Sequence, residues 1–188
     1  MIELRNVVVA YESRVILDSI NLTIDDGETL VILGGSGSGK STLLRLLIGL
    51  QRPTSGQIIV DGTDITTLSE DEFNTVRRKM GMVFQYSALF DSMSVGENVA
   101  FGLRQHTDLG DDEIKRIVAE RLDWVGLKGY ESYMPNELSG GMKKRVSLAR
   151  AIALDPSLIL YDEPSSGLDP ITSGTISMLI KGMQQRLG

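Results

Sequence analysis

The amino-acid sequence predicts an α/β fold in which strands alternate with helices and a block of helices is inserted before the last strand. Short apolar runs with strand character, bounded by turn residues, recur in the first half of the chain. From about residue 92 to 154 the apolar residues change to helical spacing. One more buried strand and a final helix follow, and this order is typical of a sheet covered by helices.

Elements of the first half are predicted from apolar spacing and turn residues. Residues 2–10 are rich in valine, and residues 20–24 alternate apolar and polar side chains, so both indicate strands. Residues 29–33 form an apolar run typical of a buried strand, and a helix is predicted from Lys40 to about residue 50. The other elements predicted here are a strand over 57–60 closed by an Asp61–Gly62 turn, a helix from about 71 to 79 behind a Ser69–Glu72 capping box, and a strand over 82–84.

The second half is predicted to be mainly helical. Gly126 is placed to end one of its helices. Residues 158–161 indicate a buried strand, and residues 171–187 indicate the last helix. The helix before Gly126 is predicted from apolar residues at helical spacing, namely Ile114, Ile117, Val118, Leu122 and Val125.

Length and composition limit the class of protein. With 188 residues the chain has room for one domain of ordinary size. Its 19 basic and 25 acidic residues give a formal charge of −6, which disfavours a general nucleic-acid binder because such proteins need a basic surface. Without cysteine the chain has neither disulfides nor thiolate metal ligands. No apolar run approaches the roughly 18 residues that span a bilayer, and the first residues lack the order of a signal peptide.

A glycine-rich loop lies between a predicted strand and a predicted helix. It matches G-x-x-x-x-G-K-[ST] at every fixed position, and glycines let successive backbone N–H groups point at phosphate oxygens. We expect Lys40 to meet the β- and γ-phosphates and Ser41 to be a ligand of Mg²⁺. The alternative, a Gly/Ser turn that precedes a lysine by chance, does not explain the strand and helix on either side. The residues predicted to bind nucleotide here are Gly34, Gly35, Ser36, Gly37, Ser38, Gly39, Lys40, Ser41 and Thr42.

Two acids follow the last predicted strand. Asp162 and Glu163 would face the edge of the sheet where α/β proteins bind ligands. Asp162 is a candidate Mg²⁺ ligand, and Glu163 is a candidate base that orients and deprotonates an attacking water. Taken alone, such a pair is usually part of a solvated loop, but the phosphate loop upstream favours the catalytic interpretation.

The segment Leu138-Ser139-Gly140-Gly141 begins a predicted helix. Ser139 is a good N-cap, and glycine in a first turn weakens a helix, so two in succession suggest close approach to an anion. With this segment as signature, the chain resembles the ATP-binding subunit of ABC transporters over essentially its whole length. The resemblance identifies Gln85 as the Q-loop glutamine, 166–169 as the D-loop, and Tyr11 as the aromatic residue that stacks on adenine. On the sequence alone Tyr11 would be an ordinary strand tyrosine.

This resemblance implies a P-loop NTPase fold with an ABC-type β-subdomain and an inserted helical subdomain, in a single domain over 1–188. Residues 1–85 and 156–188 would form the nucleotide-binding core, and about 86–155 the helical subdomain. It implies two subunits in a head-to-tail dimer on ATP, the signature of one facing the γ-phosphate held by the other. The residues that it adds to the nucleotide site are Ser139, Gly140, Gly141, Asp169 and Gln85. The implied catalytic residues are Gln85, Glu163 and Lys40. The implied Mg²⁺ ligands are Ser41, Gln85 and Asp162.

Met142 stands where the signature commonly has glutamine. With residues 84–91 and 134–145, it makes the chain most similar to ATPases of lipid-handling permeases, the lipid-asymmetry and mycobacterial-cell-entry-associated systems. The resemblance therefore implies an ATPase that energises transport of lipids or other apolar molecules, bound to permease subunits at the cytoplasmic side of the inner membrane. The ATPase of a polar-solute importer, for example of amino acids, is the alternative. A soluble ABC-type ATPase acting on DNA or ribosomes is disfavoured by the acidic charge.

Members of the family carry a switch histidine, which senses the γ-phosphate, on the strand that follows the helix after the D-loop. This sequence ends before that strand, so we expect the C-terminal part of the core to be missing and hydrolysis by this chain to be slow. His106, the only histidine, precedes the signature and is expected to be a solvated loop residue. Leu89 and Phe90 after Gln85 either pack under the helical block or receive a short helix of the permease.

Overall fold

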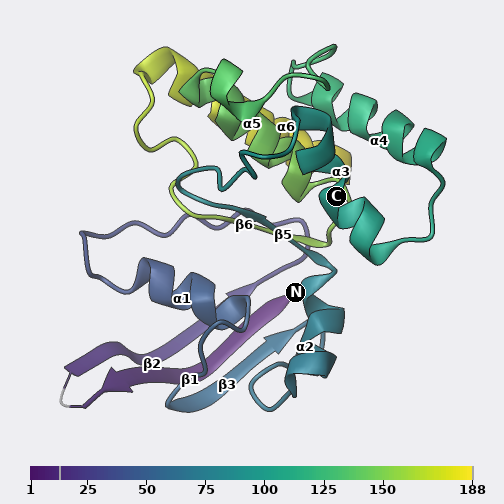
Figure 1. Ribbon diagram of the computed structural model, residues 1–188. Helices are drawn as coiled ribbons and strands as arrows, with labels where there is room; N and C mark the ends of the chain where they lie inside the picture. The colour runs from purple at the N-terminus through teal and green to yellow at the C-terminus, as the bar shows by residue number, and fades with distance from the viewer. Residues whose placement is uncertain (13, 188) are drawn as a thin grey trace. The chain divides into compact units, whose positions relative to one another are not determined.

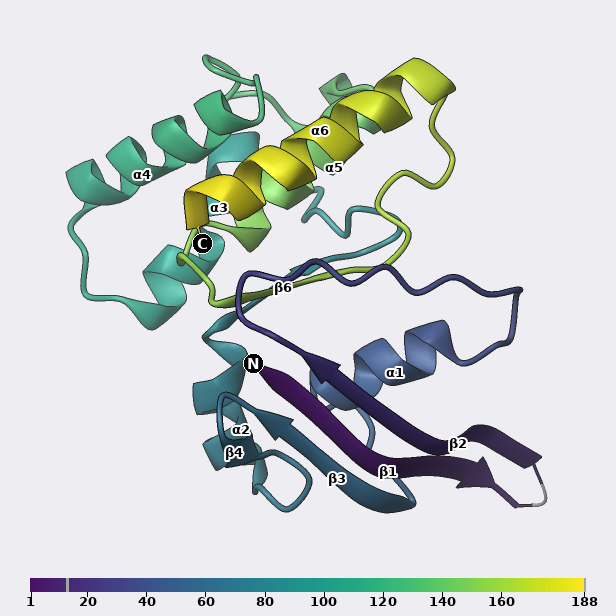
Figure 2. The ribbon, with the colours of Figure 1, turned by 180° about the vertical axis from the view of Figure 1, so that it is seen from behind.

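The computed structural model describes residues 1–187 apart from residue 13, and Figures 1 and 2 show its elements from opposite sides. The chain divides into two compact units, Met1–Arg77 and Arg78–Leu187, which are described in turn. Among the residues described, no helix is long and apolar enough to span a membrane. The elements expected from the sequence are present in both units, with one exception in the first.

The first unit is built on a four-stranded antiparallel sheet in the order β2-β1-β3-β4. Apolar residues of β1 face the core, but the inward face changes from Ile2 and Leu4 to Val7 and Val9 along the strand. A β-bulge at Asn6, whose φ is 49°, adds the residue that shifts this alternation. The strands are β1 (Ile2–Tyr11), β2 (Arg14–Ile24), β3 (Ser55–Val60) and β4 (Thr63–Asp64).

Two helices complete the first unit, α1 (Lys40–Leu47) and α2 (Glu70–Arg77). Figure 1 shows α1 lying along one face of the sheet, where it buries Leu43, Leu46 and Leu47. The guanidinium of Arg77 donates a hydrogen bond of 2.9 Å to the carbonyl of Ile48, so α2 satisfies a backbone group at the end of α1. The capping box predicted from Ser69 and Glu72 is present at the start of α2.

The strand predicted over residues 29–33 is wrong. This segment has no regular secondary structure, and Val31 and Leu33 are 71% and 88% exposed. A strand exists only where its backbone pairs with a neighbour, and no strand of the described chain pairs with these residues. The apolar run therefore gives the composition of a buried strand without the pairing that forms one.

In the second unit, two parallel strands are combined with a group of helices. β5 (Met80–Val83) pairs with β6 (Leu158–Tyr161) so that Val83 lies opposite Tyr161. The helices share one core, in which Val99, Leu122 and Val146 are fully buried, and Figure 2 shows α6 alongside α5. They are α3 (Val95–His106), α4 (Asp111–Trp124), the 3₁₀ helix η1 (Pro135–Glu137), α5 (Gly140–Ala151) and α6 (Pro170–Leu187).

The bulge in β1 depends on a glycine in the neighbouring strand, which gives a test of the first unit. Gly56 has a φ of 88°, and a Cβ there would lie 2.3 Å from the carbonyl oxygen of Asn6. We expect Gly56→Ala to lower the free energy of unfolding by about 2–4 kcal/mol, through the clash and the left-handed backbone together. Urea unfolding measures the change.

Gly62→Ala is the matched control, because Gly62 also has a positive φ of 75° but would place its Cβ in open space. This variant should lose only about 1 kcal/mol, the cost of the backbone conformation alone. Equal losses in the two variants would contradict a role for the contact with Asn6.

Candidate functional site

The predicted phosphate loop of the first unit curls around its own lysine. The Nζ atom of Lys40 donates hydrogen bonds to the carbonyl oxygens of Gly34 and Gly35, at 2.8 and 3.0 Å. Gly37 and Gly39 have positive φ values of 79° and 95°, a conformation that glycine adopts without strain. A Cβ at Gly39 would also lie 2.7 Å from Leu17. The glycines thus permit a ring of backbone around the ammonium group.

The start of α1 is a position where an anion is stabilised. Gly39 is its N-cap, and the described first turn has neither a side-chain cap nor an acidic residue. The amides and the positive end of the helix dipole therefore remain available. Ser41 is exposed and Thr42 half-buried, while Tyr11 at the end of β1 is 53% exposed.

In the second unit Gln85, the predicted Q-loop glutamine, lies beside Glu163, the predicted catalytic base. Gln85 follows β5 and Glu163 follows β6, and parallel neighbours end at the same edge of a sheet. The Nε2 atom of Gln85 donates to Glu163 Oε2 at 3.0 Å and to Ser166 Oγ at 3.4 Å. Asp162 is held by a backbone hydrogen bond of 2.9 Å from its N–H to Val83. Glu163 itself is exposed and has a φ of 43°.

At the signature, Ser139 is the N-cap of α5 and accepts a hydrogen bond of 3.3 Å from the Met142 amide, as predicted. Its two glycines differ in their surroundings. A Cβ at Gly141 would lie 2.6 Å from Thr172 of α6, whereas the nearest atom to a Cβ at Gly140 is 3.8 Å away. Gly141 is thus required by packing inside this unit, and only Gly140 is left for the expected approach of an anion.

The D-loop aspartate has a local structural role. Asp169 accepts hydrogen bonds of 3.0 Å from the amides of Ile171 and Thr172 in the first turn of α6. Hydrogen bonding from the side chain of Thr172, and then from the amides of Thr172 and Ile171, holds the pKa of Asp169 below its usual value. The carboxylate is therefore charged at neutral pH and fixed at the helix start.

Two basic residues of α5 were not predicted from the sequence, although both hold the segment after Gln85. Lys144 is buried, and its Nζ donates to the carbonyl of Gln85. Arg150 donates to the carbonyls of Ser87 and Ala88, at 2.8 and 2.6 Å. The run of basic residues after the signature was the available signal, but a basic run on a helix is usually solvated.

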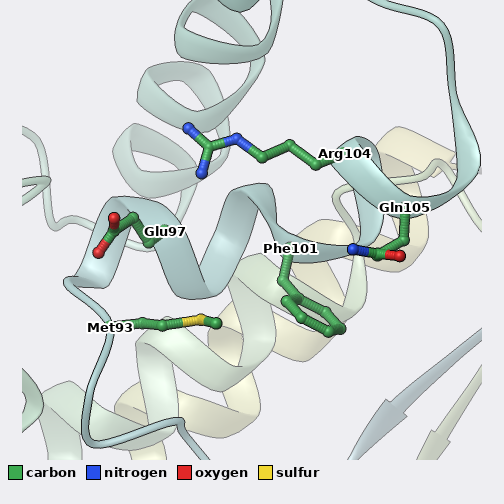
Figure 3. Close-up of a pocket in the computed structure, with 5 residues that line it drawn as sticks. All are labelled: Met93, Glu97, Phe101, Arg104 and Gln105. Carbon is green, nitrogen blue, oxygen red and sulfur yellow. The ribbon is translucent and has the colours of Figure 1, made fainter.

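An open pocket of about 230 Å³ lies beside α3. Figure 3 shows Met93 and Phe101 on one side of the helix, while Arg104 extends back towards Glu97. Phe90 is 42% exposed and stacks at a tilt on Phe101, with 4.8 Å between ring centroids. The lining residues are Met93, Glu97, Phe101, Arg104 and Gln105.

The structure decides between the alternatives for Leu89 and places His106 in a helix. Leu89 is partly buried against the helical core, so the packing alternative holds for Leu89 and only Phe90 is exposed. His106 is exposed, as expected, but it ends α3 instead of lying in a loop. Within the described chain, no three histidine or acidic residues gather into a metal-binding group.

Comparison with known proteins agrees with these observations. The phospholipid transport ATP-binding protein MlaF of Haemophilus influenzae is 49% identical over 187 residues, covering 100% of this chain and 71% of MlaF. The probable ribonucleotide transport ATP-binding protein mkl of Mycobacterium tuberculosis is 48% identical over 186 residues, covering 99% of this chain and 52% of mkl. The chain therefore spans about half the length of mkl.

Solved structures give the fold. The ATP-binding cassette MJ0796, in a dimeric post-hydrolysis state bound to ADP and Pi, matches with a TM-score of 0.89 at 35% identity, over 99% of this chain and 84% of that one. This likeness confirms the predicted P-loop fold of the ABC type. Residues 17–166 match the family described as ABC transporter, so the chain belongs to the ABC transporter family as an ATP-binding domain.

Proposed function

We propose that this chain is the ATP-hydrolysing subunit of a transporter that moves phospholipids or other apolar molecules. The observation that carries the proposal is the contact between Gln85 and Glu163 at the ends of parallel strands, because an amide and a carboxylate placed so can orient and deprotonate a water. The loop around Lys40 supplies a place for the phosphates. Similarity to MlaF, which is named for phospholipid transport, supports phospholipids as the transported molecules.

ATP binding exchanges contacts of the phosphate loop. The ammonium of Lys40, which now bonds two loop carbonyls, turns to the β- and γ-phosphates, and the free amides at the start of α1 receive the remaining phosphate oxygens. Tyr11 stacks on the adenine. Ser36 and Ser38, both exposed on the loop, donate their hydroxyls to phosphate oxygens.

Mg²⁺ fits the donor atoms of this chain. Ser41, Gln85 and Asp162 offer a hydroxyl, an amide and a carboxylate oxygen, which are the hard ligands that this ion takes. When bound, the ion neutralises part of the phosphate charge. We assign it to these three residues.

In hydrolysis, Glu163 accepts the proton of the attacking water while Gln85 orients that water. The water oxygen bonds to the γ-phosphorus, the bond from phosphorus to the bridging oxygen breaks, and ADP leaves with the electron pair. Ser139, Gly140 and Asp169 of a second subunit complete the site on the γ-phosphate side, in the head-to-tail dimer, while Gly141 packs against Thr172. The dimeric MJ0796 cassette supports this arrangement.

The partner in the membrane is a permease, contacted from the cytoplasmic side of the inner membrane. The pocket beside α3 supports this assignment, because Phe90 and Phe101 form an exposed apolar pair rimmed by Glu97 and Arg104. Transport of a polar solute is a second candidate, since the relative mkl is named for ribonucleotide transport. The two candidates share the ATP site and differ in cargo.

The first prediction concerns the phosphate loop. Lys40→Ala removes the charge that meets the phosphates and leaves the glycines in place, so we expect affinity for Mg-ATP to fall by about tenfold or more. Calorimetric titration of both proteins with Mg-ATP measures this. Lys143→Ala on α5 is the control, and an unchanged affinity of Lys40→Ala would remove the loop from the binding site.

The second prediction tests the function itself. Glu163→Gln keeps the shape of the side chain but cannot take the proton of the water, so we expect ATP binding to persist while hydrolysis falls by about a hundredfold or more. Hydrolysis is measured with the permease in phospholipid vesicles, and size-exclusion chromatography follows the ATP-bound dimer, which should accumulate. Wild-type turnover of this variant would exclude Glu163 as the base.

The third prediction separates docking from packing. Phe101→Asp should reduce permease association by about tenfold and leave ATP affinity unchanged, because Phe101 is 37% exposed on the pocket. Leu89→Asp should instead lower the melting temperature, since Leu89 packs against the helical core. Met178→Asp on α6 is the control for an exposed apolar residue, 71% exposed. Equal pull-down by Phe101→Asp and Met178→Asp would place the permease elsewhere.

A further inference from the structure

Lys144 is a buried cation beside the residues assigned to hydrolysis. It lies in the second turn of α5, is only 5% exposed, and donates to the backbone carbonyl of Gln85. The carboxylates of Asp162 and Glu163 are the charged groups near enough to attract it. A single lysine of the signature helix therefore contacts the backbone of Gln85 and is attracted by both carboxylates.

Burial of this cation is unfavourable unless it has partners. Desolvation lowers the pKa of Lys144, and it outweighs the opposing attraction of Glu163 and Asp162. An apolar side chain of similar length, such as methionine, would fill the same space without that desolvation cost. Stability of the helix core alone thus gives no reason for a lysine at this position.

The partner of Lys144 explains what the cation does. Its hydrogen bond holds the main chain of Gln85, and the side chain of the same residue holds Glu163 at 3.0 Å. The segment that follows is strained, since Ser87 and Ala88 have φ values of 64° and 47°. Arg150 bonds the carbonyls of both residues, so α5 supplies cations to the backbone of this whole turn.

We propose that Lys144 is a positioning residue for hydrolysis, which fixes the Gln85 backbone so that the Gln85 amide holds Glu163 in place. This inference rests on the proposed role of Glu163 as the base. Because α5 begins at the signature, Lys144 also connects the signature, through Gln85, to the proposed base Glu163. If the signature moves when it meets the nucleotide of a second subunit, the movement would pass along α5 to Lys144, and from there through Gln85 to Glu163.

Three variants of the full chain test the role of Lys144. Lys144→Met keeps the length and removes both charge and donor; Lys144→Arg restores both; Lys143→Met is the matched control. Lys143 is the neighbouring lysine, half-buried, with no side-chain hydrogen bond or ion pair in the described chain. Each protein is measured for Mg-ATP affinity, for kcat and KM with the permease present, and for amide hydrogen exchange.

We expect Lys144→Met to lower kcat by about tenfold, with KM and ATP affinity changed less than about twofold. Exchange of the amides in residues 84–90 should rise by about fivefold, while the rest of the helical core keeps its protection. Lys144→Arg should recover at least about half of kcat, and Lys143→Met should match the wild type.

Three results would overturn the inference. They are an unchanged kcat in Lys144→Met, an unchanged exchange rate in 84–90, or a loss of protection spread over all of α5, which indicates a merely structural role. Glu163→Gln, measured in parallel, keeps the two proposals apart. If Glu163→Gln is inactive and Lys144→Met is normal, only the positioning role fails. If Glu163→Gln keeps wild-type turnover, the proposed function fails, whereas the exchange measurement still reports on Lys144.

Discussion

The parallel pairing of β5 with β6 is the constraint on which the placement of Gln85, Glu163 and the residues around them depends. Val83 and Tyr161 are register partners, so Gln85 and Glu163 each follow an aligned pair by two residues. Parallel strands end at a common edge, which brings an amide and a carboxylate from distant parts of the sequence to 3.0 Å. A slip of one residue would turn every side chain to the opposite face and separate the two groups.

The turn between β5 and α3 has irregular backbone, and side chains from two helices satisfy its polar groups. Lys144 and Arg150 of α5 bond three of its carbonyls. Asn98 of α3, fully buried, accepts from the Phe90 amide and donates to the carbonyls of Phe90, Met93 and Ser94. Buried backbone groups are costly when unpaired, so these side chains determine the path of the turn. The same side chains connect the signature helix and α3 to the residues around Gln85.

In the first unit, the glycine-rich loop before α1 determines where the side chain of Lys40 lies. Its carbonyls hold Lys40 near the centre of the loop, and its glycines adopt left-handed conformations that other residues would resist. The lysine therefore has hydrogen-bond partners before any phosphate arrives. The two glycines of the signature differ in a similar way: Gly141 packs closely on α6, whereas Gly140 does not.

Much of this protein follows from sequence alone, because its signals are local. The strand at 158–161, the capping box of Ser69 and Glu72, the helix ending before Gly126 and the helix beginning at Lys40 depend on residues within a few positions of one another, and each is present as predicted. Only the tertiary structure decided the rest. Residues 29–33 have the composition of a strand but lack a paired neighbour, Gly141 is required by Thr172, and Lys144 contacts Gln85. These outcomes depend on contacts between residues that are distant along the chain, on which periodicity and spacing carry no information.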